Sequence, residues 1–324
     1  MTRNVDGRGR TTIWVTGDQL APSNPALAVV DKKWTRVLMI ESLGWARERP
    51  YHKSKLVLIY AAMRGFADDL RREGWHVDYF AEREDFEGPL AEHVAAFRPG
   101  RVRMMSQSDF GVTEQLCAAV ASFGIPVDVE PHCNFISTPD DFDELFARGR
   151  ERVTMETFYR KMRRKTGLLM DDGVPAGGTW NFDTENRLPP KKDMRFPAPV
   201  VGPERPHVRD AIALVEAHFP DHPGSAANFD LPTTRADALA YADEFFATRL
   251  DLFGPYEDAM VRGEPRLYHS RLSAAINVGL LHPLELCERA ELTYRNGSAR
   301  LASVEGFVRQ LIGGASSSGA CTGG

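Results

Sequence analysis

The sequence has few cysteines and lacks the spacings by which cysteines bind metal. Its 324 residues include four of them, Cys117, Cys133, Cys287 and Cys321, and none lies two to four residues from another. This spacing argues against a local metal site, and we interpret all four as free thiols in a reducing compartment. No apolar run reaches the roughly 18–20 residues of a membrane helix. Because the polar start MTRNVDGRGR is unlike a signal peptide, we expect a cytoplasmic protein without a membrane partner.

Familiar catalytic and phosphate-binding motifs are missing as well. The chain has no Gly-rich dinucleotide fingerprint, P-loop, HExxH pair or serine-hydrolase elbow, and its nine histidines do not cluster with carboxylates. Hydrolytic and metal chemistry are therefore disfavoured. The formal net charge of −5 gives no overall attraction to nucleic acid. Any DNA binding would have to come from local basic surface.

Strand and helix patterns alternate through the first part of the chain. Short apolar or β-branched runs, typical of strands, occur at 11–17, 36–42, 76–80, 101–105 and 125–130. Helical spacing separates them at 55–74, 89–99 and 113–124. Strands joined by helices lie parallel with right-handed crossovers. We therefore predict an α/β fold with an open, doubly wound, parallel sheet of five strands.

The strand pattern ends near residue 131. Helices are predicted at 138–149 and 154–167, before a long Gly- and Pro-rich connection at 171–206 of the kind that often covers a functional feature. Only helices follow, at 207–218, 233–251, 256–261, 268–277, 283–295 and 300–312. We expect a disordered leader at 1–10, an α/β domain at 11–131, a helical and irregular connection at 132–206, the first part of a helical domain at 207–312, and a tail at 313–324.

The first candidate site follows the first predicted strand. Ligands of open parallel sheets bind beyond the carboxyl ends of the strands. Asp18 and Gln19 lie there, and Glu41 follows the second strand. Amide and carboxylate groups suit a neutral heterocycle. A helix cap and a turn would explain the same residues without a ligand.

The second candidate lies in the stretch LYHSRLSAAINVGLLHP. Ser270 and Ser273 flank the first turn of a predicted helix, where free backbone N–H groups favour a phosphate. Asn277 lies one turn further on the same face. Helix capping explains Ser270 alone, but not all three side chains.

The third candidate is a basic run in the predicted helix 154–167. As a DNA-backbone contact it would give sequence-independent, salt-sensitive affinity; as a solvated helix face it needs no ligand. Trp180 and Phe182 lie in the long connection that follows, either to stack on an unstacked base or to anchor the connection to the core. The run consists of Arg160, Lys161, Arg163, Arg164 and Lys165.

Five stretches together resemble the cryptochrome/photolyase family, in its bacterial iron–sulfur, photolyase-related branch that repairs (6-4) photoproducts. They are GDQL, YHKSKLVLIYAAMRGFADDLRREG, TMETFYRKMRRKTGLLMDDGVPAGGTWNFDTENR, HSRLSAAINVGLL and VEGFVRQLIG. The resemblance extends from about residue 11 to residue 313.

The resemblance implies a monomeric, light-driven DNA-repair lyase that acts on UV-damaged DNA. Reduced FAD would deliver an electron to a flipped lesion, and a 6,7-dimethyl-8-ribityllumazine antenna in the α/β domain would collect light. Asp18, Gln19 and Glu41 would then line the antenna site. A cryptochrome-like light sensor and a lumazine-binding module without catalysis are alternatives. The flavin would contact Tyr256, His269, Ser270, Leu272, Ser273, Asn277, Glu305, Arg309 and Gln310.

The sequence departs from the family after VEGFVRQLIG. The family continues with a Trp-Arg-Glu-aromatic stretch and with the residues that complete the flavin pocket, contact the lesion and hold a 4Fe-4S cluster. We expect neither the cluster nor repair activity from the chain as given, and its catalytic residues stay unknown. One set of codons for 313–324 reads Gly-Trp-Arg-Glu-Phe after a single inserted base, so we hypothesise a frame change there. An exposed apolar face on 300–312 would then be an aggregation liability.

Overall fold

The computed structural model describes residues 9–28, 30–146, 154–191, 194–198, 200 and 202–320. The chain divides into two compact units. Unit 1 consists of Met1–Cys133, Gly202–Arg235 and Asn277–Leu280, and unit 2 of Asn134–Val201, Ala236–Ile276 and Leu281–Gly324. Among the described residues, no helix combines the length and the apolar character needed to cross a membrane. The described part of the chain does not include residues 1–8 of the predicted leader, nor Cys321.

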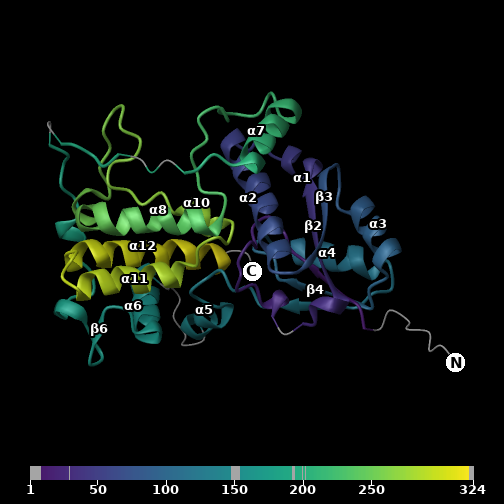
Figure 1. Ribbon diagram of the computed structural model, residues 1–324. Coiled ribbons are helices and arrows are strands. Elements are labelled where there is room, and N and C mark those ends of the chain that lie inside the picture. The colour runs from purple at the N-terminus through teal and green to yellow at the C-terminus, as the bar shows by residue number, and fades with distance from the viewer. Residues whose placement is uncertain are drawn as a thin grey trace. The chain divides into compact units, whose positions relative to one another are not determined.

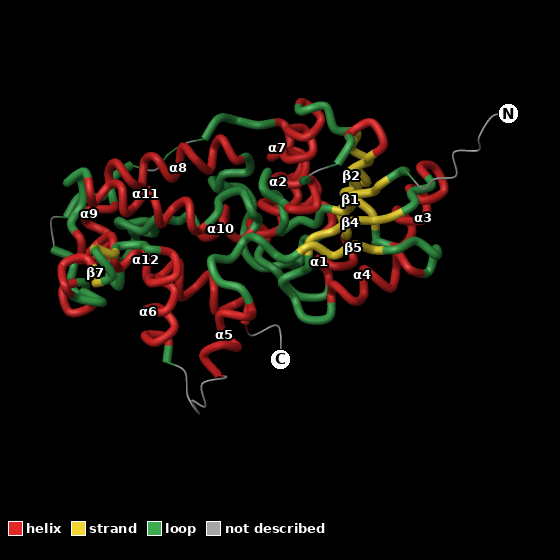
Figure 2. Tube along the Cα trace, turned by 90° about the horizontal axis from the view of Figure 1, so that it is seen from below, coloured by secondary structure: helices red, strands yellow, loops and turns green. Residues whose placement is uncertain are grey.

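Unit 1 contains the predicted sheet. Its five strands are all parallel and follow the order β3-β2-β1-β4-β5. Figure 2 shows β2, β1, β4 and β5 side by side in this order. The doubly wound α/β prediction is confirmed. The strands are β1 (Thr11–Trp14), β2 (Thr35–Ser42), β3 (His76–Arg83), β4 (Arg101–Met105) and β5 (Val127–Glu130).

Alternating side chains fill the two faces of the sheet. On one face Trp14, Leu38 and Met104 pack against Leu90 and Val120, which come from helices. Those helices are α3 (Glu87–Phe97) and α4 (Val112–Ala121). On the other face, α2 (Lys53–Arg72) packs against β2 and β3. Parallel strands covered on both faces read as continuous apolar runs, which is why the sequence identifies the central strands well.

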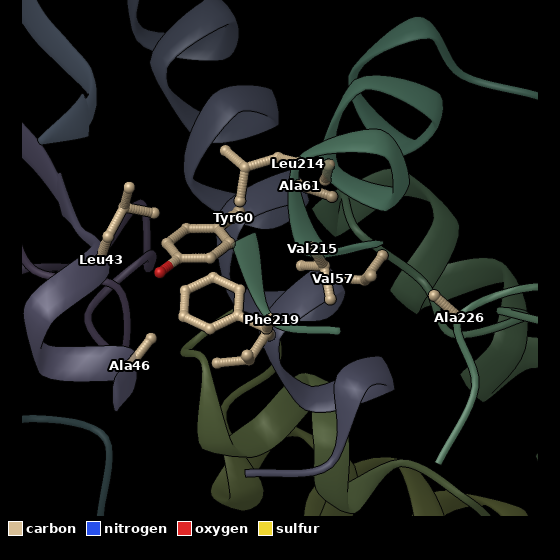
Figure 3. Close-up of a cluster of buried hydrophobic side chains, with 11 residues drawn as sticks. Leu43, Ala46, Val57, Tyr60, Ala61, Leu214, Val215, Phe219 and Ala226 are labelled. Carbon is tan, nitrogen blue, oxygen red and sulfur yellow. The ribbon is translucent and has the colours of Figure 1, made fainter. Parts of the chain in front are cut away.

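The helix α7 (Pro206–His218) belongs to unit 1, although the sequence placed it in the helical domain. Phe219, just after α7, and Tyr60 of α2 lie in one buried cluster with Leu43 of α1 (Leu43–Arg47). Figure 3 shows these rings beside each other. The chain thus returns from the long connection to complete the α/β core before unit 2 continues. Sequence order alone could not indicate this return.

Unit 2 is built around a phenylalanine cluster. Phe307 of α12 lies within 6.0 Å, ring centroid to ring centroid, of Phe245, Phe246 and Phe253. Those three come from α8 (Arg235–Thr248) and α9 (Leu250–Phe253), and α11 (Pro283–Arg295) packs along α12 (Leu301–Ala320), as Figure 1 shows. Phe307, Val308 and Ile312 are buried. The expected exposed apolar face on 300–312 is therefore wrong for the chain as it stands.

The helix boundaries in unit 2 differ from the predictions. Instead of helix 268–277 there is only the short α10 (Ser273–Asn277), because Leu267 and Arg271 have positive φ angles of 47° and 55°. Instead of helix 256–261 there is a single turn, η5 (Gly254–Tyr256). The α12 backbone stays helical to Ala320, beyond the predicted end at 312.

The predicted long connection contains short regular elements. Before it come α5 (Pro139–Phe146) and α6 (Met155–Thr166), and residues 147–149 of the predicted helix 138–149 lie outside the described residues. Thr154 caps α6 by accepting the amide of Thr157 at 3.2 Å. The connection itself carries the hairpin β6 (Met170–Asp171) and β7 (Val174–Pro175), followed by η3 (Ala176–Gly178) and η4 (Asp183–Glu185).

Candidate functional site

The carboxyl ends of β1 and β4 carry a polar network. The strand order reverses between these two strands, which makes the edge a topological switch point where open α/β sheets bind ligands. The Thr16 hydroxyl lies 2.8 Å from Asp18 Oδ1 and 3.0 Å from Gln107 Oε1. The Ser108 hydroxyl donates to Asp18 Oδ2 at 3.1 Å. The predicted Asp18 is thus joined to side chains from the β4 end that sequence reasoning missed.

Gln19 lies beneath this network and is fully buried. Its Nε2 donates to the backbone carbonyls of Met105 at 3.2 Å and Ser106 at 2.9 Å, which fixes the orientation of the amide. Its Oε1 is buried and accepts no hydrogen bond from the described residues. A buried acceptor without a donor costs about 1–3 kcal/mol, so this edge suits a ligand that brings an N–H or O–H group.

Glu41 does not belong to this edge network. The residue lies inside β2 and is fully buried. Its Oε1 accepts Arg64 Nε at 2.7 Å and the Tyr79 hydroxyl at 2.5 Å, and its Oε2 accepts Arg64 Nη2 at 2.9 Å and the Glu82 amide at 3.2 Å. All four acceptor positions are occupied. The interpretation of Glu41 as part of the rim is therefore corrected: it is a buried ion-pair residue, because Arg64 and Tyr79 satisfy it.

In unit 2, Glu305 of α12 forms hydrogen bonds to two other segments of the same unit. Its Oε1 accepts the Tyr159 hydroxyl of α6 at 2.8 Å, and its Oε2 accepts the Phe182 amide at 3.0 Å. Glu305 has no exposed surface, and burial raises its pKa although both hydrogen bonds oppose the rise. The interpretation as a flavin contact is corrected here, since Glu305 is enclosed by α6 and the connection.

The Arg309 guanidinium, one turn beyond Glu305, lies close to three carboxylates. Its Nη2 lies 2.9 Å from Asp183 and 3.4 Å from Glu257, and its Nε lies 3.5 Å from Glu305. Gln310 donates to Glu257 Oε2 at 3.2 Å. Burial raises the pKa of Glu257 to about 7, and the Arg309 guanidinium only partly offsets this. One cation thus faces an excess of carboxylate, and Glu257 holds a proton near neutral pH.

Replacing Glu257 by glutamine should flatten the pH dependence of stability. The folded-state pKa lies above the unfolded value, so the folded state binds more protons between about pH 4.5 and pH 7. The raised pKa therefore stabilises the folded state fully below about pH 4.5, and this contribution of about 3 kcal/mol is lost as the pH rises to about 7 and beyond. Urea unfolding at pH 5 and pH 8 measures the decline in Glu257→Gln. The control Glu264→Gln removes an exposed carboxylate elsewhere in unit 2 and should keep the decline, whereas an unchanged decline in Glu257→Gln would contradict the assignment.

Asn186 fills a narrow space between two glycines. Its Nδ2 donates to the carbonyl of Ala302 at 3.2 Å. A Cβ at Gly306 would lie 2.8 Å from that Nδ2, and a Cβ at Gly254 would lie 2.6 Å from the backbone of Ser303. The glycines within FGPYE and VEGFVRQ thus permit these two stretches to pack closely against NFDTEN.

Gly254→Ala should destabilise unit 2 by about 2 kcal/mol or more, because the added methyl group meets backbone that cannot move away. Thermal unfolding followed by circular dichroism measures the loss. Gly202→Ala is the control, because a Cβ at Gly202 would meet no atom within 4 Å and Gly202 does not have a positive φ angle. Gly263 is unsuitable as a control, because its φ angle of +88° would strain an alanine there. Equal melting temperatures for Gly254→Ala and Gly202→Ala would contradict the packing described.

The remaining predicted flavin residues fall into two groups. Tyr256 and Leu272 are buried, and Tyr256 stacks on Tyr268 with ring centroids 5.8 Å apart. Both residues are packed into the core of unit 2, and their assignment as flavin contacts stays a prediction. The residues with solvent-accessible side chains are His269, Ser270, Ser273, Asn277, Arg309 and Gln310. Ser270 accepts the Leu272 amide at 3.4 Å, a contact within the turn before α10, whose first helical hydrogen bond joins the Ile276 amide to the Leu272 carbonyl.

The basic run is largely paired within unit 2. Lys161 and Lys165 lie 2.7 Å from Glu144 and Asp141 respectively, and Arg160 lies 2.7 Å from Glu156. Arg163 is fully buried and donates to the carbonyls of Leu168, Leu169 and Trp180. A DNA contact by Arg163 is therefore ruled out by burial. Arg164 is exposed, with its guanidinium 4.7 Å from the Trp180 ring centroid.

No group of three or more His, Cys, Asp or Glu residues in the described part of the chain is arranged to hold a metal ion. Among those residues Cys117, Cys133 and Cys287 are free thiols. Burial raises the pKa of Cys287 above its ordinary value.

A family model for deoxyribodipyrimidine photo-lyase-related proteins matches residues 13–231. The chain belongs to this family. It is 40% identical over 307 residues to a (6-4) photolyase of Agrobacterium fabrum (strain C58 / ATCC 33970), covering 93% of this chain and 60% of that protein. The chain thus spans about 60% of the length of this curated relative. The resemblance inferred from the sequence is confirmed.

The fold of this photolyase-related protein also matches a solved structure. A bacterial class III photolyase from Agrobacterium tumefaciens aligns with a TM-score of 0.58 over 94% of this chain and 57% of the other, at 13% identity. At 13% identity, the match supports a conclusion about the fold alone. Of the residues that sequence reasoning missed, Tyr159, Asp183 and Asn186 lie within one of the family stretches, and Glu257 lies outside them. Their partners are far away in sequence, so no local pattern indicated their role.

Proposed function

We propose that this photolyase-related chain forms the antenna-binding unit and part of the flavin-binding unit of a cytoplasmic, monomeric, light-driven DNA-repair lyase for (6-4) photoproducts. The observation that carries the proposal is the 40% identity over 307 residues to a protein named (6-4) photolyase. Since the chain spans 60% of that relative, repair as a whole is part of the proposal and not of the finding.

The residues of this chain fit FAD in part. Bound reduced FAD would supply an electron to the lesion on absorbing blue light. The accessible Ser273 hydroxyl and Gln310 amide of unit 2 suit contacts to its phosphates and hydroxyls, and the accessible Asn277 amide of unit 1 is a separate polar group of the same kind. Glu305 and Arg309 hold α12 against α6 and the connection. The excess of carboxylate around Arg309 makes a phosphate beside Glu257 unfavourable, so we assign phosphate contacts to Ser273 and not to Gln310.

The edge of β1 and β4 fits a neutral heterocycle such as 6,7-dimethyl-8-ribityllumazine. Gln19 Oε1 is a buried acceptor that would receive an N–H or O–H donor, and Asp18 is held by Thr16 and Ser108 beside it. This edge lies within unit 1 and favours the second candidate function, a chromophore-binding module that acts without catalysis.

For DNA, the exposed Arg164 beside Trp180 is the cation best placed to meet a phosphate. A flipped lesion costs less to extrude than an intact base pair, because its stacking and pairing are already weakened. We therefore expect tighter binding to an oligonucleotide with one (6-4) photoproduct than to the undamaged strand. A cyclobutane dimer of the same sequence is the control for lesion choice, and equal affinity for all three would contradict the assignment.

The antenna site is tested by titrating the lumazine and following its fluorescence. We expect saturable one-to-one binding that falls about tenfold in Gln19→Leu, since the ligand loses its buried acceptor and the two backbone carbonyls lose their donor. Gln115→Leu on α4, which has an exposed side chain, is the control. Absence of lumazine binding would overturn this part of the proposal, and an FAD titration followed by absorbance tests the other part separately.

A further inference from the structure

A cavity opens in unit 1 on one face of the sheet, from the amino ends of β1, β2 and β4 to Glu130 at the carboxyl end of β5. Its volume is about 450 Å³, within the usual range of small-molecule sites. Its lining includes Thr11, Thr35, Arg103 and Glu130 from β1, β2, β4 and β5. Along β4, Arg103 alternates with Val102 and Met104, which pack against α3 and α4. The cavity therefore lies on the opposite face of the sheet.

Short turns border this part of the sheet. The elements bordering it are η1 (Pro25–Leu27), which packs on β4 and β5, and η2 (Lys32–Trp34). Trp34 stands in the cavity wall with 42% of its surface exposed. The Lys33 ammonium lies 5.3 Å from the Trp34 ring centroid, and the indole surface that stays exposed is suited to stack on a planar ring.

Charged pairs between β4 and β5 supply the polar contacts. Arg103 Nη2 lies 2.5 Å from Glu130, and Arg103 Nη1 donates to the Ala28 carbonyl at 3.0 Å. Arg101 lies 2.9 Å from Asp128, and both of these side chains are about half exposed. Asp31 Oδ1 accepts the Lys33 amide at 2.9 Å. The salt bridges fix the positions of the guanidinium groups, and the carboxylates of Asp128 and Glu130 line the cavity beside them.

The balance of charge selects the kind of ligand. Three carboxylates, of Asp31, Asp128 and Glu130, line the cavity against two guanidinium groups, of Arg101 and Arg103. A phosphate therefore gains no net attraction here, whereas hydroxyl groups find carboxylate acceptors and ring nitrogens or carbonyls find guanidinium donors. We propose that this cavity binds a neutral, planar nitrogen heterocycle bearing a ribosyl or ribityl chain, stacked on Trp34 with its hydroxyl groups at Asp128 and Asp31.

The same chemistry occurs in nucleosides and in uncharged flavins, so the experiment uses adenosine and riboflavin as separate probes. Isothermal titration with the full chain should show saturable binding of at least one of them. Trp34→Ala should weaken that binding roughly tenfold, and Asp128→Asn several-fold. Adenosine monophosphate should bind more weakly than adenosine, because its phosphate meets the carboxylates.

Two control variants change exposed side chains outside the cavity. Gln115→Leu and Phe110→Ala should leave the binding unchanged. Circular dichroism checks that each variant is folded. The proposal is overturned if neither probe binds, if binding persists in Trp34→Ala, or if the monophosphate binds more tightly than adenosine. Riboflavin binding that is lost in Gln19→Leu but kept in Trp34→Ala would assign the ligand to the antenna edge instead.

Discussion

Replacing Phe307 by alanine is expected to lower the free energy of unfolding of unit 2 by about 3–5 kcal/mol. The Phe307 ring is 2% exposed and meets the rings of Phe245, Phe246 and Phe253 at centroid distances between 5.0 and 6.0 Å. Truncation therefore removes both the buried area and edge-to-face contacts with α8 and α9, and it leaves a cavity that rigid helices cannot close.

Hydrogen exchange of peptides from α8 and α12 measures this loss within unit 2. Phe307→Leu should cost much less because it keeps most of the volume, and Met260→Ala, at a side chain that is 90% exposed, should cost almost nothing. Protection in β1 and β4 should stay unchanged, since these strands belong to unit 1. Equal protection of α12 in Phe307→Ala and Met260→Ala would show that the cluster does not stabilise the unit.

The sheet could be predicted from the sequence because its central strands, β1, β2 and β4, are largely buried on both faces. Runs such as Val37–Ile40 are apolar throughout, and helices with clear periodicity separate them. The edge site followed from the same reasoning, since Asp18 and Gln19 come directly after β1. Its other half, Gln107 and Ser108, follows β4, and only the strand order places the two ends together.

The site in unit 2 was much less predictable. Glu305 looks like a polar residue on one face of a helix, yet Tyr159 and the Phe182 amide enclose it from segments more than 120 residues away in sequence. The short α10 shows a second limit: helical spacing over 268–277 is offset by positive φ angles at Leu267 and Arg271, which no periodicity reveals. The role of the basic run was equally ambiguous, because the sequence does not show which backbone carbonyls surround Arg163 and bury it.

Arg163 and Arg164 therefore offer an internal comparison of structure and function. Arg163→Met should lower the free energy of unfolding by about 3–5 kcal/mol, because the carbonyls of Leu168, Leu169 and Trp180 would lose a fully buried cationic donor. Arg164→Met, one position further, removes only an exposed cation over the Trp180 ring and should cost well below 1 kcal/mol. Urea unfolding measures both variants.

DNA binding should respond in the opposite way. Under conditions where both variants are folded, Arg164→Met should weaken binding to damaged DNA and reduce the slope of log affinity against log salt concentration by about 1, as expected for one lost phosphate contact. Arg163→Met should leave that slope unchanged, since its guanidinium is enclosed by backbone carbonyls. A changed slope in Arg163→Met, or an unchanged slope in Arg164→Met, would reverse the assignment of the two neighbouring arginines. The salt slope separates the roles because a purely structural loss lowers the affinity at every salt concentration alike.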